Sequence, residues 1–158
     1  MIPNFEPQLI LPRLAGLLRR GDYLLFSANL APGDDYAEGV NRILPQYDNT
    51  LTRDWLMTFL LQLGVEKTDG KLRFTVETDP TGSGLKRVAA HFHFTKPRKI
   101  QVEEEHFDFR SGESIRLFFS YRYAPDRVRA LLCEHRLEVL DRWITASEEE
   151  GVFLCRKR

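Results

Sequence analysis

Cysteine is scarce in this chain of 158 residues, and long apolar runs are lacking. The two cysteines, Cys133 and Cys155, lie too far apart in sequence to suggest a pair of metal ligands, and nothing in the sequence suggests secretion. We therefore expect two reduced thiols in a cytoplasmic protein. No apolar run approaches the roughly 20 residues that a membrane-spanning helix needs. The opening MIPNFEPQ also lacks the basic and apolar regions of a signal peptide.

An excess of either charge is also lacking, because 23 basic residues equal 23 acidic ones. Without an overall field, neither nucleic acid nor an anionic membrane is expected as a partner. The length suits one domain with a core of ordinary size.

Hydrophobic periodicity predicts a mixed α/β order of elements. The expected order is helix 7–20, strand 22–30, a helix from Asp34 or Asp35 to 44, a helix capped by Thr50 or Thr52 and ending at 63, antiparallel strands between 71 and 121, helix 125–134, and strands 136–146 and 151–158. Strand 22–30 lacks clean alternation, so we expect both its faces to be covered. A doubly wound sheet would repeat strand–helix–strand units from its beginning. Here the centre looks like an insertion and the start looks cut.

Several residues could have a ligand-binding role, but a purely structural role is the simpler interpretation of each. The glycine cluster TGSG (81–84) lies between alternating segments, which favours a hairpin turn over a phosphate cradle. His91 and His93 have the spacing of two ligands on one strand face, but a solvated polar face is the favoured interpretation. Trp55, Trp143 and Cys133 fall at periodic apolar positions and are expected in the core.

Five stretches, in order, carry a resemblance that covers nearly the whole chain. They are MIPNFEP (1–7), GDYLLFSANL (21–30), YDNTLTRDWL (47–56), SGESIRLFFSYRY (111–123), and VRALLCEHRLEVLDRWIT with GVFLC (128–145 and 151–155). Together they resemble the C-terminal half of the histidine-specific, S-adenosylmethionine (SAM)-dependent methyltransferases, of the type that methylates the α-amino group of histidine.

The resemblance implies an α/β fold with a partial Rossmann-like methyltransferase sheet that an α+β substrate-recognition domain interrupts. Residues 1–33 and 122–158 would form the remnant of the methyltransferase domain, and residues 34–121 the inserted domain. No glycine-rich strand-to-helix turn, and no acidic residue about 20 positions beyond one, is present. We therefore expect no SAM binding by this chain alone, although the complete family enzyme uses SAM.

The resemblance also implies four substrate contacts. Asn4 matches a family asparagine near the amino-acid substrate, with capping of the first helix as the alternative. Tyr47 matches a family tyrosine that contacts the substrate, with packing between helices as the alternative, and Asp48 and Asn49 are expected to shape the helix entry. Ser120 matches a family serine that helps to recognise the substrate side chain.

Phe118 departs from the family, which carries a glutamate there to address the imidazole of histidine. Because a phenyl ring offers no charged acceptor, an aromatic or otherwise apolar amino-acid-like substrate becomes more plausible. No catalytic residue and no metal site is assigned.

Two other hypotheses remain open: a non-catalytic module from a truncated or split methyltransferase, which binds a small molecule or a partner, and an unrelated α+β binding domain. In the truncated fold, strand 22–30 would lose a neighbour and expose unpaired backbone groups. We therefore expect a homo-oligomer through this edge, with a chain that supplies the missing half as a further possible partner.

Overall fold

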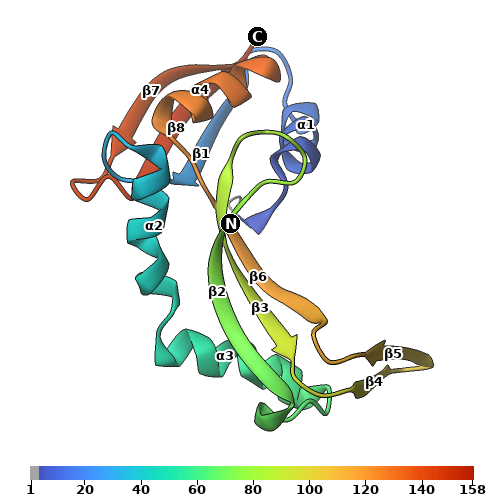
Figure 1. Cartoon of the computed structure of the whole chain (residues 1–158). Helices are drawn as coiled ribbons and strands as arrows, with labels where there is room; N and C mark the ends of the chain where they lie inside the picture. The colour runs from blue at the N-terminus through green and yellow to red at the C-terminus, as the bar shows by residue number, and fades with distance from the viewer. Residues whose placement is uncertain (1–3) are drawn as a thin grey trace. The chain divides into compact units, whose positions relative to one another are not determined.

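The computed structural model describes residues 4–158, which form helices and mainly antiparallel strands (Figure 1). They divide into two compact units. The first unit contains the described residues up to Arg42 together with Thr78–Arg87 and Ser120–Arg158. The second unit contains Ile43–Glu77 and Val88–Phe119. Each unit is described by itself below.

The first unit is built on a three-stranded sheet in the order β1-β8-β7. Strands β1 (Tyr23–Asn29) and β7 (Leu137–Ile144) each pair antiparallel with β8 (Glu150–Lys157), so β1 and β7 run parallel to each other. Helix α4 (Pro125–Glu134) packs against β7 and begins with its proline at the first helical turn, as the sequence predicts. The core on one face of the sheet contains Phe26, Ala28, Phe153 and Cys155.

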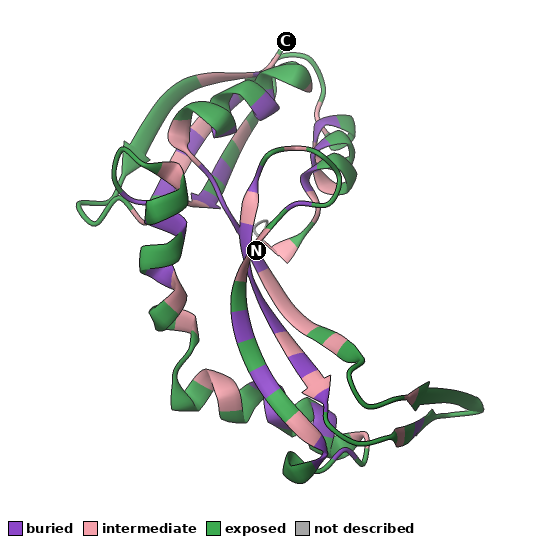
Figure 2. Cartoon of the chain, viewed as in Figure 1, coloured by how far each residue is buried: buried purple, intermediate pink, exposed green. Residues whose placement is uncertain are grey.

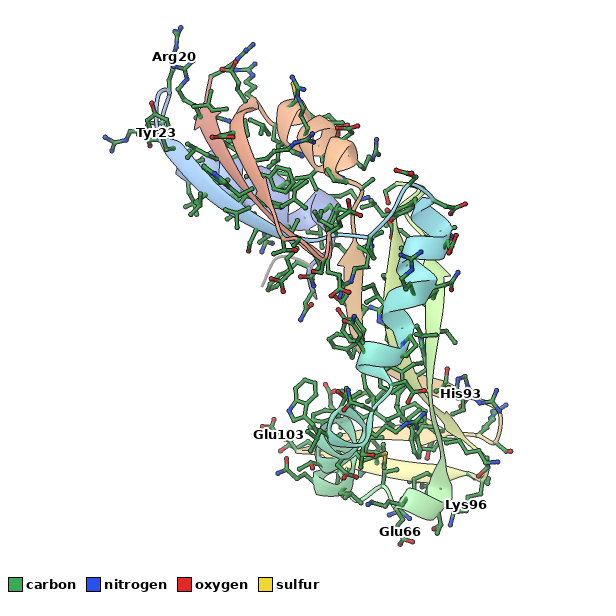
Figure 3. The ribbon with its side chains drawn as sticks, turned by 90° about the vertical axis from the view of Figure 1, so that its left-hand side faces the viewer. Arg20, Tyr23, Glu66, His93, Lys96 and Glu103 are labelled. Carbon is green, nitrogen blue, oxygen red and sulfur yellow. The ribbon has the colours of Figure 1, made fainter. Side chains whose placement is uncertain are left out.

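The opposite face of this sheet is open, which corrects the expectation that β1 is covered on both sides. Leu25 and Tyr23 are 67% and 61% exposed, and Tyr23 lies on the outer side of the sheet in Figure 3. The expectation failed because an apolar strand sequence is compatible with burial of both faces and also with one buried face and one exposed apolar face.

Helix α1 (Pro7–Leu17) is shorter than predicted. Its C-cap is Leu18, and the chain then turns at Gly21, whose φ of 93° favours glycine. The amide of Arg19 donates to Asp22 Oδ2 at 2.8 Å and stabilises this turn into β1.

The second unit contains the end of α2 (Tyr36–Tyr47), helix α3 (Thr50–Gln62), a 3₁₀ turn at Lys67–Asp69 and parts of a sheet in the order β2-β3-β6. The strands are β2 (Gly70–Thr78), β3 (Lys86–Phe94) and β6 (Ser114–Arg122), and β4 (Arg98–Val102) with β5 (Glu105–Phe109) forms a separate hairpin. Figure 2 shows β2 banded in buried and exposed residues, the alternation that its sequence predicts. Leu60, Phe92 and Phe94 are among the buried residues of this unit.

The helix starts agree in part with the expected caps. Asp35 accepts from the amide of Glu38 at 2.9 Å, as one of the two expected caps of α2. Helix α3 is capped by Asn49, which accepts from the amide of Thr52 at 3.0 Å, and not by Thr50 or Thr52. Asn49 is the cap because it directly precedes the first helical residue, so that its side-chain oxygen can accept from the third amide of the helix.

Three residues expected in the core are on the surface. Trp55 is 65% exposed and Trp143 is 52% exposed, and Cys133 is exposed on α4. Helix α3 has apolar residues on two sides, and the side that packs carries Leu56 and Leu60. Periodicity alone cannot tell which of two apolar stripes meets the core.

Candidate functional site

Tyr47 and Phe118 form an aromatic pair in the second unit. Their ring centroids are 5.5 Å apart with planes tilted by 38°, and both side chains are half-buried. Tyr47 is the last residue of α2, and Phe118 lies in the middle of β6. The pair presents apolar ring surface together with one phenolic hydroxyl.

The turn after Tyr47 is fixed by its own side chains. Asn49 donates from Nδ2 to the carbonyl of Gln46 at 2.7 Å, besides capping α3. Asp48 pairs with Arg53 Nε at 2.5 Å. These contacts confirm that Asp48 and Asn49 shape the entry to α3, and they hold Tyr47 at the end of α2.

Ser120 lies in the first unit and is buried. Asn29, the last residue of β1, donates from Nδ2 to Ser120 Oγ at 3.2 Å. The backbone reinforces this junction, because the amide of Tyr123 donates to the carbonyl of Asn29 and the amide of Ala31 donates to the carbonyl of Tyr123, each at 3.0 Å. Asn29 was not among the predicted contacts, although a polar residue at the carboxyl end of a strand is a usual ligand position in α/β sheets.

Asn4 is half-buried and precedes α1. The helix has Glu6 at its N-cap and Pro7 in its first turn, without a side-chain cap. The capping alternative for Asn4 is therefore wrong, while its contact with a substrate stays a prediction. Of the four predicted contacts, Asn4 and Ser120 lie in the first unit, and the structure pairs Tyr47 with Phe118 in the second.

A buried polar network in the first unit had no counterpart in the sequence predictions. Asp79 is 3% exposed and accepts from Tyr121 Oη at 2.9 Å, from Ser83 Oγ at 2.5 Å and from the hydroxyl of Thr81. Arg87, also buried, donates to Tyr121 Oη at 3.4 Å. The network joins the turn between β2 and β3 to the residue that follows Ser120.

The pKa values of this network follow from burial and hydrogen bonding. Burial alone would raise the pKa of Asp79, but the hydrogen bonds from Ser83, Thr81 and Tyr121 outweigh it and hold the pKa at about 2. Burial, and then donation to Asp79, raise the pKa of Tyr121 to about 12. At neutral pH the network therefore consists of a carboxylate and a neutral phenol.

The TGSG cluster is the hairpin turn that the sequence predicts. It lies between β2 and β3, and Gly82 and Gly84 have φ values of 81° and 73°. The hydroxyls of Thr81 and Ser83 are directed to Asp79. The hydroxyls of this cluster thus donate to a carboxylate of the same chain, that of Asp79.

Comparison with known families gives a match to the model of the "Histidine-specific methyltransferase, SAM-dependent" over residues 73–157, more than half of the chain. The chain belongs to this family. The match includes Phe118 and Ser120, whereas Asn4 and Tyr47 precede it. The sequence resemblance is thereby confirmed at the level of the family.

No curated protein matches the chain. Among solved structures, it is similar to an S-adenosylmethionine-dependent methyltransferase from Clostridium acetobutylicum ATCC 824, with 12% sequence identity and a TM-score of 0.39. The similarity covers 93% of this chain and 49% of that one, so the chain spans about half the length of that methyltransferase.

The described residues do not fit the cofactor that the family name implies. The turn from β1 into α2 contains one glycine, Gly33, whose amide donates to Glu148 Oε2 at 3.0 Å. The turn from β6 into α4 consists of Tyr123 and Ala124 and contains no glycine. In residues 4–158, therefore, neither strand-to-helix turn provides the glycine-rich cradle of a Rossmann-type site.

His91 has a carboxylate partner, because its Nε2 lies 2.6 Å from Glu77 Oε1, and its ring is 6.1 Å from that of His93. Burial, followed by the charge of Arg73, lowers the pKa of His93. Within the part of the chain that the structure describes, no three or more His, Cys, Asp or Glu side chains gather as potential metal ligands. None of the helices in residues 4–158 has both the length and the apolar character to cross a membrane.

Proposed function

We propose that this chain supplies the substrate-recognising part of a SAM-dependent N-methyltransferase that acts on an amino acid or a similar amine. The observation that carries the proposal is the family match over residues 73–157, which includes the whole of β6 with Phe118 and Ser120. Methyl transfer to an amine depends mainly on how the amine is oriented toward the methyl group. Residues that bind and orient the amine are therefore the expected contribution of this chain.

The side chains offer suitable chemistry for such a substrate. In the second unit, Tyr47 and Phe118 provide an aromatic wall and a phenol that can accept from an amine. Phe118 supports an aromatic or apolar substrate side chain, because an imidazole would find no charged acceptor there.

The proposed fold places residues 1–33 and 122–158 in the remnant of a Rossmann-like methyltransferase sheet, with 34–121 as an inserted recognition domain. The sheet β1-β8-β7 supports this proposal, since two parallel strands flank one antiparallel strand. Doubly wound sheets often carry such an antiparallel strand near an edge.

Phenylalanine is expected to bind the chain weakly, and Tyr47→Ala is expected to weaken its binding about tenfold. The physical reason is loss of ring contact and of one hydrogen bond, worth together about 1–2 kcal/mol. Chemical-shift titration with phenylalanine measures the change. Trp55→Ala is the matched control, because Trp55 is an exposed aromatic residue on the helix that follows. Unchanged affinity in Tyr47→Ala, or no binding of any amino acid by the native chain, would contradict the proposal.

SAM is expected to show no measurable binding to this chain alone. The two strand-to-helix turns within residues 4–158 are not glycine-rich, and the amide of Gly33 is engaged by Glu148. Titration calorimetry with SAM and with S-adenosylhomocysteine measures this directly. Stoichiometric binding of either compound at micromolar concentration would show that the cofactor site is present.

A further inference from the structure

Arg53, near the start of α3, joins the turn between α2 and α3 to the sheet of the second unit. Its Nε lies 2.5 Å from Asp48 Oδ1, in that turn. Its Nη1 donates to the carbonyl of Leu72 in β2 at 3.0 Å. Its guanidinium carbon lies 5.5 Å from the centroid of the Phe74 ring, on the same strand. A planar guanidinium can make these contacts together, because its N–H groups point in several fixed directions.

The exposure of these groups indicates that Arg53 contributes to geometry more than to overall stability. The side chains of Arg53 and Asp48 are 40% and 35% exposed, whereas Leu72 and Phe74 are buried. An ion pair with this exposure contributes little to the free energy of unfolding. The same guanidinium, bound to a carboxylate, a carbonyl and a ring, restrains where the turn lies on the strand.

This restraint extends to Tyr47, because Asp48 directly follows it. The side-chain bonds of Asn49 are local, to groups three positions before it and three positions after it. They define the shape of the turn, whereas Arg53 connects the turn to the sheet. Phe118, whose ring centroid lies 5.5 Å from that of Tyr47, is on β6 of the same sheet. The position of the turn on β2 therefore affects how the two rings meet.

We propose that Arg53 is a positioning residue, which holds Tyr47 against Phe118 in the arrangement that binds the amine substrate. For its effect on binding, this inference rests on the proposed function. A ligand that binds groups already in place does not have to order them, so its affinity is higher. Arg53 acts through Asp48 and β2, and needs no contact with the substrate.

Nuclear magnetic resonance tests the positioning without a ligand. The native chain is expected to show a nuclear Overhauser effect between the rings of Tyr47 and Phe118, which are in contact. Arg53→Met keeps an aliphatic side chain and removes the guanidinium, and it is expected to lose most of this effect, which falls steeply with distance. Arg73→Met is the matched control, because Arg73 is an exposed arginine of β2 in the same unit. Equal effects in the two variants would overturn the inference.

Two further variants test the route through Asp48. Arg53→Lys keeps a charge, but an ammonium group cannot hold the carboxylate and the Leu72 carbonyl in one fork, so part of the ring contact is expected to remain. This variant also serves if Arg53→Met does not fold. Asp48→Ala is expected to weaken the contact, and its combination with Arg53→Met to weaken it no further than Arg53→Met alone, because both remove the same ion pair. Additive losses would overturn the route.

Titration with phenylalanine tests the consequence for binding. Arg53→Met is expected to weaken binding about fivefold, which corresponds to the usual cost of ordering one side chain, and Arg73→Met to bind like the native chain. Circular dichroism below the unfolding midpoint confirms that each variant is folded. A variant that loses the ring contact and still binds like the native chain would overturn the inference. If the native chain binds no amino acid, the proposed function fails, while the ring contact in Arg53→Met still decides whether Arg53 positions Tyr47.

Discussion

Replacing Asp79 by alanine is expected to destabilise the first unit by about 3–5 kcal/mol. The carboxylate accepts from Tyr121, Ser83 and Thr81 in a buried position, and hydrogen bonds to a charged group contribute about 1.5–3 kcal/mol each before the losses overlap. Alanine would remove the acceptor of the buried Tyr121 phenol and of two less buried hydroxyls, and Arg87 would remain nearby as a buried charge. Urea unfolding, followed by circular dichroism, measures the loss.

Two control variants distinguish loss of the Asp79 hydrogen bonds from a general effect of removing a carboxylate. Asp34→Ala removes an exposed carboxylate from the same unit and is expected to change stability by less than about 0.5 kcal/mol. Asp79→Asn keeps the size of the side chain and removes the charge, so an intermediate loss is expected. If Asp79→Ala were as stable as Asp34→Ala, the network would not support the fold.

The pH dependence of unfolding provides a second readout of the same prediction. The folded pKa of Asp79 is about 2, below the ordinary value of 3.8. A carboxyl group whose pKa is lower in the folded state stabilises the fold. This stabilisation is fully present above pH 3.8 and is lost as the pH falls toward 2. The native chain should therefore lose stability in this window, and Asp79→Asn should lose less. Parallel pH profiles for the two proteins would count against the ionised state of Asp79.

Local patterns predicted the order of elements well, because each pattern reports on its own segment. Pro125 starts α4, and the TGSG cluster turns between β2 and β3. The exposure of Trp55 and Trp143 could not be predicted, since periodicity identifies an apolar stripe without saying whether a partner covers it. The open face of β1 was missed for the same reason.

Contacts between distant segments were beyond the reach of pattern analysis. Asp79 and Tyr121 are 42 positions apart and share no motif, so their hydrogen bond had no signal in the sequence. Asn29 and Ser120 are 91 positions apart, and only the strand-end location of Asn29 gave a general hint. Tyr47 and Phe118 were identified through the family resemblance, and the structure adds that their rings are in contact. Their role toward a substrate remains a prediction.

Phe118→Glu is expected to shift the ratio of histidine to phenylalanine affinity by about 100-fold in favour of histidine. A carboxylate at this position of β6 would accept from an imidazole N–H, which contributes about 1.5–3 kcal/mol. The same change removes the ring that contacts Tyr47 and disfavours a phenyl group. Each of the two effects is worth about tenfold, or 1.4 kcal/mol. Chemical-shift titrations with both amino acids measure the ratio.

Phe118→Gln is the matched control for this exchange, because it has nearly the size of glutamate and loses the same ring contact, but it brings no charge. It should weaken phenylalanine binding like Phe118→Glu, while its gain for histidine should be small, since a neutral acceptor is roughly half as strong as a charged one. Unfolding midpoints of the two variants should agree, because Phe118 is only half-buried. A native chain that already prefers histidine to phenylalanine would show that the ring of Phe118 does not set the substrate class.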